Sequence, residues 1–210
     1  GSMLRSILDG FVWVRGQPVI KGLLFLGVAS SVFGISYQAL LPVFSRDLLS
    51  GPGATVGLLG LPEAARSVLT PELGLGLIGT VTGLGAILGS LIVAALGHGP
   101  HRRLLLMGGG LGFGLCIALF ALSPILLLSL LFALALGVLS QIFLTSTFTL
   151  IQVLSPDHIR GRVVSINSVI FGLVPVGQFA LGIAAEVMGT PLAVAAFGGL
   201  FLLLAAVIVL

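Results

Sequence analysis

The segment SPDHIRGRV, residues 155–163, concentrates side chains that could do chemistry. Asp157, His158, Arg160 and Arg162 fall within six consecutive positions, although only 7% of the 210 residues are charged. A guanidinium group can bind a carboxylate and a helix-terminal carbonyl at the same time. The segment therefore favours a polar contact that holds helix ends together.

Catalytic chemistry is not expected from this composition. An enzyme acting inside a membrane needs a nucleophile beside a base, or a set of metal ligands, at depth. The three histidines, His98, His101 and His158, lie outside the long apolar runs, and no acid within those runs is placed to orient one. We therefore expect no enzyme, no cofactor and no metal site.

The composition predicts a protein that is embedded in lipid. Hydrophobic residues make up 58% of the chain, and its 9 basic and 6 acidic side chains are too few to cover a soluble core. The formal charge of +3 is too small to indicate a nucleic-acid partner. The expected surroundings are a lipid bilayer.

Six apolar segments are long enough to cross a bilayer as helices, which takes about 20 residues each. They are residues 19–44, 73–97, 104–122, 125–154, 163–187 and 191–210. This predicts an all-α polytopic membrane protein. Gly1 and Ser2, ahead of Met3, are interpreted as a tag remnant, and residues 18–210 as the six-helix bundle with an outer loop at 45–72.

The distribution of basic residues predicts a cytoplasmic N-terminus. The segments on that side hold Arg5, Arg15, Lys21, Arg102, Arg103, Arg160 and Arg162, and the opposite side holds only Arg46 and Arg66. Residues 155–163 then form a short cytoplasmic loop, in which Ser155 caps the fifth helix and Asp157 complements its dipole. An orientation signal with a helix cap is the simplest interpretation of this segment.

Polar side chains form stripes on three of the six predicted helices. At about 100° per residue, the members of each stripe share one face. The stripes contain Tyr37 and Gln38 on the first helix, Gln141, Thr145, Thr149 and Gln152 on the fourth, and Asn167 and Gln178 on the fifth. Each residue alone could bond within its own helix or to a neighbour. Together the stripes predict a shared, water-facing substrate surface, with the third and sixth helices facing lipid.

The second predicted helix carries small residues spaced alternately by three and four positions. Gly76, Gly79, Gly83, Ala86 and Ser90 share a face, which is typical of close helix packing. The first and fourth helices each begin a group of three and carry the densest stripes. A group of three repeated in a membrane must invert its topology, which is a common transporter plan.

Two runs resemble a known family. They are ILDGFVWVRGQPVIKGLLFLGVASSVFGISYQALLPVFSRDLL and VLSPDHIRGRVVSINSVIFGLVPVGQFALGIAAEVMG. The chain resembles the C-terminal six-helix half of major facilitator superfamily transporters, in the bacterial siderophore and drug exporter branch. The most specific matches are Asp-Gly…Gln-Pro ahead of the first helix, YQALLPVF at its end, and PD-x-x-RGR. Residues 97–103 depart from the family pattern because they lack its loop aspartate.

The resemblance implies a function that the residues alone do not. It implies half of a secondary active transporter in the bacterial inner membrane, built from two inverted three-helix repeats, with residues 3–17 as an amphipathic linker. The expected partners are an N-terminal six-helix half or a second copy, and a small, moderately apolar or amphipathic organic substrate that is exported by alternating access. A facilitator-fold scaffold or assembly module that does not transport is the alternative.

The resemblance and the charges together extend the interpretation of residues 155–163. We expect Asp157, Arg160 and Arg162 to form a cytoplasmic gate that holds helix ends when the inner side is closed. One acid beside two arginines exceeds what an orientation signal needs. No acidic or basic residue lies deep in any predicted helix, so a coupling group for protons would lie outside this chain.

Overall fold

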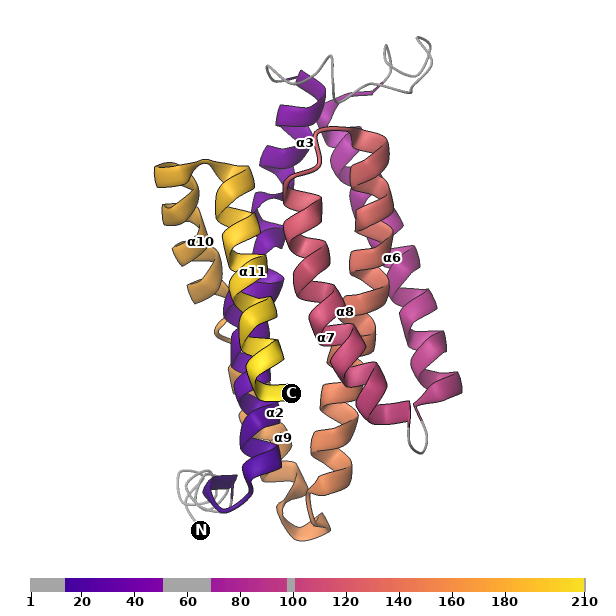
Figure 1. Cartoon of the computed structure of the whole chain (residues 1–210), viewed down its shortest axis with the longest axis vertical. Coiled ribbons are helices and arrows are strands. Elements are labelled where there is room, and N and C mark those ends of the chain that lie inside the picture. The colour runs from indigo at the N-terminus through magenta and orange to yellow at the C-terminus, as the bar shows by residue number, and fades with distance from the viewer. Residues whose placement is uncertain (1–13, 51–68, 98–100, 210) are drawn as a thin grey trace.

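A computed structural model describes residues 14–50, 69–97 and 101–209, and these residues are helical almost throughout, with no strand among them. The elements are α2 (Pro18–Ala29), the π-helix η1 (Ser30–Gly34), the 3-10 helix η2 (Ile35–Leu40), α3 (Leu41–Ser50), α6 (Pro71–Leu96), α7 (His101–Ala121), α8 (Leu126–Leu154), α9 (Asp157–Phe171), α10 (Val174–Met188) and α11 (Thr190–Val209). Figure 1 shows them as an elongated bundle of roughly parallel rods.

Six helical stretches in the described residues are long and apolar enough to cross a membrane. Helix one runs without a break from Pro18 to Ser50 through α2, η1, η2 and α3, and helix five comprises α9 and α10. The all-α polytopic fold is therefore confirmed. The predicted outer loop is shortened at both ends, because residues 45–50 and 71–72 are helical, and residues 51–68 lie outside the described part of the chain. Most of the predicted linker, residues 3–13, also lies outside it.

The turn between α8 and α9 is shorter than predicted. Helix five begins at Asp157, so the arginines of this segment lie on a helix and not in a loop. The prediction that Ser155 caps helix five is wrong, because Pro156 occupies that position. Ser155 instead ends α8, and its Oγ donates to the carbonyl of Ile151 at 2.6 Å. A serine hydroxyl readily bonds the carbonyl four residues earlier in its own helix. Asp157 lies in the first turn of α9, where it complements the helix dipole as expected.

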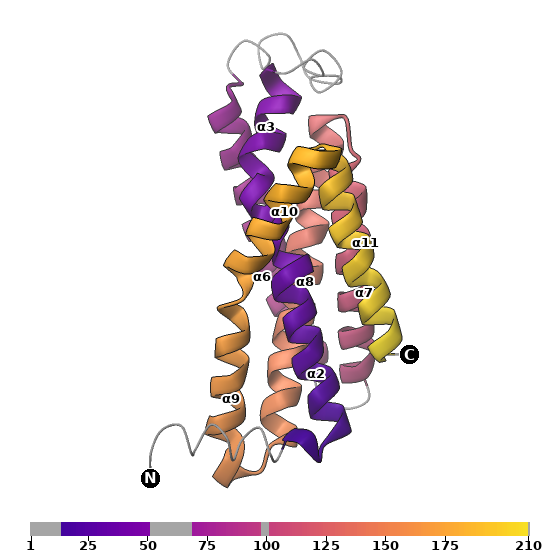
Figure 2. The ribbon, with the colours of Figure 1, turned by 90° about the vertical axis from the view of Figure 1, so that its left-hand side faces the viewer.

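The contacts between helices follow one pattern in which helices one, two and three correspond, in order, to helices four, five and six. Helix two (α6) packs on helix four (α8), and helix five (α10) packs in the same way on helix one at η1 and η2. Helix three (α7) packs on α8, and helix six (α11) packs on α2 and η1. In this pattern the contact between α7 and α11 corresponds to itself, and these two helices lie side by side in both views (Figure 2). This is the arrangement of two inverted three-helix repeats, half of a major facilitator fold.

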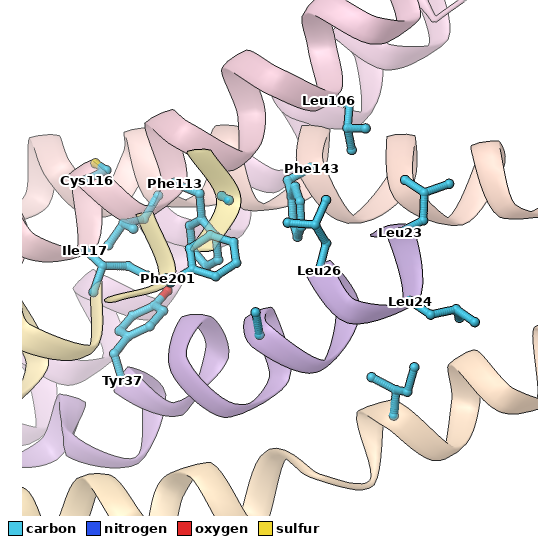
Figure 3. Close-up of a cluster of buried hydrophobic side chains, with 14 of the residues drawn as sticks. Leu23, Leu24, Leu26, Tyr37, Leu106, Phe113, Cys116, Ile117, Phe143 and Phe201 are labelled. Carbon is cyan, nitrogen blue, oxygen red and sulfur yellow. The ribbon is translucent and has the colours of Figure 1, made fainter. Parts of the chain in front are cut away.

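An aromatic cluster occupies the centre of the bundle (Figure 3). Phe201 of α11 makes edge contacts with Phe113 of α7 and Phe143 of α8, with ring centroids 5.6 and 5.5 Å apart. Tyr37 of helix one joins from the other side, 6.3 Å from the ring of Phe120. Edge-to-face pairs contribute about 0.5–1.5 kcal/mol each beyond burial. The cluster therefore ties four of the six helices together.

The backbones of α6 and α8 are in direct contact at two glycines. A Cβ atom added at Gly137 would lie 2.0 Å from the carbonyl oxygen of Thr82, and one added at Gly85 would lie 2.2 Å from that of Leu134. Because lipid tails are as apolar as leucine, helices in a membrane associate through such close packing.

The packing face of α6 differs from the predicted one. Added Cβ atoms at Gly76, Gly79 and Gly83 meet nothing within 4 Å, so these residues do not form a packing face within the described chain. The buried row contains Gly74, Ile78, Gly85 and Gly89 instead. Within this row Gly85 and Gly89 contact α8, whereas Gly74 contacts Ser45 and Leu49 of α3.

This difference predicts opposite outcomes for two matched glycine substitutions. We expect Gly85→Ala to destabilise the protein by about 1–3 kcal/mol, because the methyl group must push two backbones apart. Gly79→Ala should be neutral or stabilising by up to about 1 kcal/mol, since alanine favours helix and the position is open. Melting temperatures of the detergent-solubilised variants give the comparison. An equal loss of stability in both variants would contradict the assigned contact.

Candidate functional site

A cavity of about 390 Å³ lies between α2, α8 and α9. It is lined by Gly27, Ser30, Gln141, Phe143, Leu144, Thr145, Thr147, Phe148, Asn167, Ser168 and Phe171. Gln141 and Thr145 lie at the middle of α8, so the cavity opens about halfway along the bundle. None of the lining side chains carries a charge, and most of the polar ones are hydroxyls or amides.

Asn167 is the most informative polar group of the lining. It is 5% exposed, yet its amide forms no hydrogen bond with any other described residue. Among the described residues, the fully buried side-chain polar atom without a partner is Ser31 Oγ, so the amide atoms of Asn167 reach open space in the cavity. Gly27 faces it across the cavity wall, where an added Cβ atom would lie 3.6 Å from Asn167 Oδ1. Asn167 therefore presents one acceptor and two donor hydrogens to whatever enters the cavity.

The α8 side of the cavity combines hydrogen-bonding groups with aromatic surface. Gln141 Nε2 donates to Thr145 Oγ1 at 3.0 Å, which leaves the Gln141 carbonyl oxygen and the Thr145 hydroxyl hydrogen available. Phe148 and Phe171 are exposed at the rim, Phe171 to 41%. The arrangement suits a ligand with both aromatic surface and uncharged polar groups.

Two backbone irregularities border the cavity. Helix one changes from α to π at Ser30, a cavity residue, and then to 3-10 winding over Ile35–Leu40. Helix five is interrupted between Phe171 and Val174, directly after the cavity residue Phe171. Short π segments occur preferentially at functional sites. The cavity therefore lies where both of its bordering helices depart from regular winding.

Three of the predicted surface residues meet in this cavity. Gln141, Thr145 and Asn167 line it together. Thr149 lines a smaller cavity of about 180 Å³ with Arg102 and Ser146. The separation follows from helix geometry, because eight residues beyond Gln141 the α-helix has turned about 80° further.

Four predicted residues lie elsewhere. Tyr37 is 4% exposed and its ring packs on Phe113 and Phe120, so it is a packing residue in this structure (Figure 3). The predicted polar stripe on helix one assumes α-helical periodicity. The π and 3-10 segments rotate the residues after Ser30 out of that phase. Gln38 is exposed, while Gln152 and Gln178 are half-buried, and none of the three lines the cavity.

Sequence reasoning missed the aromatic part of the lining. Phe148 lies seven residues after Gln141, two helical turns along the same face, so its spacing alone could have identified it. Phe171 could not be placed in this way, because its position depends on the interruption after α9.

Arg160 connects the end of α8 to the start of α9. Its Nη2 lies 2.5 Å from Asp157 Oδ1, and its Nε donates to the carbonyl of Gln152 at 3.0 Å. One guanidinium thus binds a carboxylate and a helix-terminal carbonyl together. Arg162 is half-buried and lies two residues further along the same helix, about half a turn away.

The sequence matches one family over its whole length. The model of the family described as transmembrane secretion effector matches residues 1–210. Curated relatives are proteins named enterobactin exporter EntS: 27% identity over 169 residues for that of Escherichia coli O81 (strain ED1a), 29% for that of Citrobacter koseri and 27% for that of Shigella boydii serotype 18. Each alignment covers 76% of this chain and 33% of the relative. No solved structure matches the chain significantly.

Three observations support the same fold. They are the six helices long enough to span a membrane, the equivalent contacts of the first three and the last three helices, and the family match over residues 1–210. The chain belongs to the transmembrane secretion effector family, within the major facilitator superfamily of transporters.

Proposed function

We propose that this chain forms one half of an exporter that moves a small, uncharged or weakly polar amphipathic molecule by alternating access. The observation that best supports this function is the uncharged cavity halfway along the bundle. The unpaired amide of Asn167 lies on one side of it, and exposed aromatic rings lie at its rim. Its volume of about 390 Å³ falls within the range of ordinary small-molecule sites. The relatives' printed name, enterobactin exporter, supports export as the direction.

A second six-helix unit completes the transporter in this proposal. The chain spans about a third of the length of the curated relatives that it matches. Helix two and helix five are the least buried spans, each with 17% of its most apolar window inside the described bundle. The open row of Gly76, Gly79 and Gly83 on helix two would let another backbone approach closely. An N-terminal half or a second copy would cover these faces.

The proposal places the basic end of the bundle in the cytoplasm of a bacterial cell, with the chain in the inner membrane. The basic end is where α2, α7 and α9 begin, and it holds Arg15, Lys21, Arg102, Arg103, Arg160 and Arg162. The positive-inside rule supports this orientation. The contact of Arg160 with Asp157 and Gln152 is then a cytoplasmic tie between helices four and five, and it forms part of a gate with Arg162.

Transport by the reconstituted transporter tests the function. In proteoliposomes that contain this chain together with its other half, an amphipathic aromatic test compound should be moved in a gradient-dependent manner. Asn167→Leu should reduce the rate about tenfold, since it removes the hydrogen-bonding groups and keeps the number and branching of the side-chain heavy atoms. Ser165→Ala is the matched control, because Ser165 is exposed on the same helix and bonds only the carbonyl of Gly161. Insertion without transport of any such compound would favour the non-transporting scaffold.

Cysteine accessibility tests the cavity independently of transport. In a Cys116→Ala background, a membrane-impermeant thiol reagent should label Thr145→Cys and Ser168→Cys, because both line the cavity. The lipid-side control is Leu131→Cys, which is 60% exposed on α8 but borders no cavity with polar walls. Equal labelling of Leu131→Cys and Thr145→Cys would show that the cavity has no separate access to water.

The tie at Arg160 predicts a modest transport defect. Arg160→Lys keeps the positive charge and removes the planar fork that reaches both Asp157 and Gln152. The Arg160 side chain is 45% exposed, so the tie contributes about 0.5–1 kcal/mol, and transport should fall about two- to fivefold with normal insertion. Arg46→Lys at the opposite end is the control. A wild-type rate for Arg160→Lys would leave the segment with its orienting role alone.

A further inference from the structure

We propose that an anionic phospholipid binds in a groove at the basic end of the bundle, between α2, α7, α8 and α11. Its phosphate would lie on Arg102 and Arg103, and its acyl chains would run along the apolar walls. The groove shares no lining residue with the cavity around Asn167, so it is a separate site.

The walls of the groove are apolar and come from four helices. The groove has a volume of about 600 Å³. Leu23 and Leu26 of α2, Leu106 of α7, Leu150 of α8 and Ile208 of α11 line it. Figure 3 shows Leu23 and Leu26 projecting from α2 and Leu106 projecting from α7. Leu23, Leu26 and Leu106 are nearly buried and form the apolar floor of the groove, beside the exposed side chain of Val19, which an acyl chain could contact.

The charged groups of the groove are all positive. Arg102 and Arg103 are its charged lining residues. Arg102 Nε donates to the carbonyl of Gly97 at 3.3 Å, which anchors the guanidinium and leaves its terminal nitrogens free to bind an anion. Neither arginine forms an ion pair with a carboxylate of the described residues. A phosphate would supply the missing partner, and guanidinium groups bind phosphate oxygens in a bidentate manner.

The local electrostatics of α7 also favour an anion at this place. The helix begins His101-Arg102-Arg103, and its first turn has no acidic residue. Cations at the start of a helix oppose its dipole, so the two arginines are unfavourable there without a counter-anion. A bound phosphate reverses this penalty, because it is attracted by both guanidinium groups and by the helix.

The depth of the groove selects a lipid over a soluble anion. Arg102 and Arg103 stand at the first turn of a membrane-spanning helix, and Leu104, the next residue, is exposed to the surroundings. Charge at the headgroup level with hydrocarbon directly below it matches an amphiphile. Basic pockets between membrane helices at the cytoplasmic face bind anionic headgroups in this way.

Lipid retention in native mass spectrometry tests the site. The full chain is purified in a mild detergent and mixed with equimolar phosphatidylglycerol and phosphatidylcholine. We expect the wild type to retain phosphatidylglycerol preferentially. The Arg102→Gln/Arg103→Gln variant should lose about thirtyfold of this preference, given roughly 1 kcal/mol for each of the two basic residues. Lys21→Gln is the matched control, because Lys21 is exposed at the same end and does not line the groove.

A second variant separates the groove from general surface charge. Gly22 lines the groove, and a Cβ atom added there would lie 3.3 Å from Ile208 Cγ2, so Gly22→Leu fills the space and keeps both arginines. We expect it to abolish the preference too. Leu150→Phe replaces it if Gly22→Leu lowers the melting temperature. The proposal is overturned if the filled groove still retains phosphatidylglycerol, if the wild type shows no preference, or if 10-fold excess inorganic phosphate removes the lipid.

Discussion

Close backbone contact at positions without a side chain is the constraint on which this bundle depends. Gly85 and Gly137 bring α6 onto α8, Gly177 brings α10 onto helix one, and Gly114 and Gly198 join α7 to α11. When the first three helices are exchanged with the last three, the contact of α6 with α8 corresponds to the contact of α10 with helix one. The contact of α7 with α11 corresponds to itself. In lipid, where apolar surface gains little from meeting other apolar surface, helix pairs are selected by how closely they can approach.

The cavity is a consequence of where this close approach is absent. Around Gly27, α9 meets helix one at ordinary van der Waals distance, 3.5 Å from an added Cβ atom to Ile170 Cγ2. Helix five is interrupted after Phe171, so α10 can pack tightly on η1 and η2 while α9 follows a separate line. Space remains between α2, α8 and α9, and polar side chains such as Asn167 and Thr145 line it.

The charged side chains of the described residues lie at the ends of the bundle, so charged and uncharged polar groups have different roles. At the basic end, Arg160 ties α8 to α9, and Arg102 and Arg103 face the groove at the start of α7. Halfway along the bundle, recognition depends on uncharged groups such as Asn167 and Thr145. An uncharged interior is inexpensive to hold in lipid, whereas a charged one needs paired partners. The proposed substrate class follows from this distribution.

The sequence by itself determined the six spans, the all-α fold and the concentration of basic residues at one end, because apolar length and charge are properties of local segments. It also predicted one shared surface for Gln141, Thr145 and Asn167, which lie on regular α-helix, where 100° per residue holds, and which line the same cavity in the structure. Only the tertiary structure decided that Tyr37 is a packing residue and that Phe171 lines the cavity, because the π and 3-10 winding of helix one and the interruption of helix five change the phase of everything after them. It also decided which glycines of α6 are buried, since Gly85 and Gly89 have the same four-residue spacing as Gly79 and Gly83, and only the position of α8 distinguishes the two pairs.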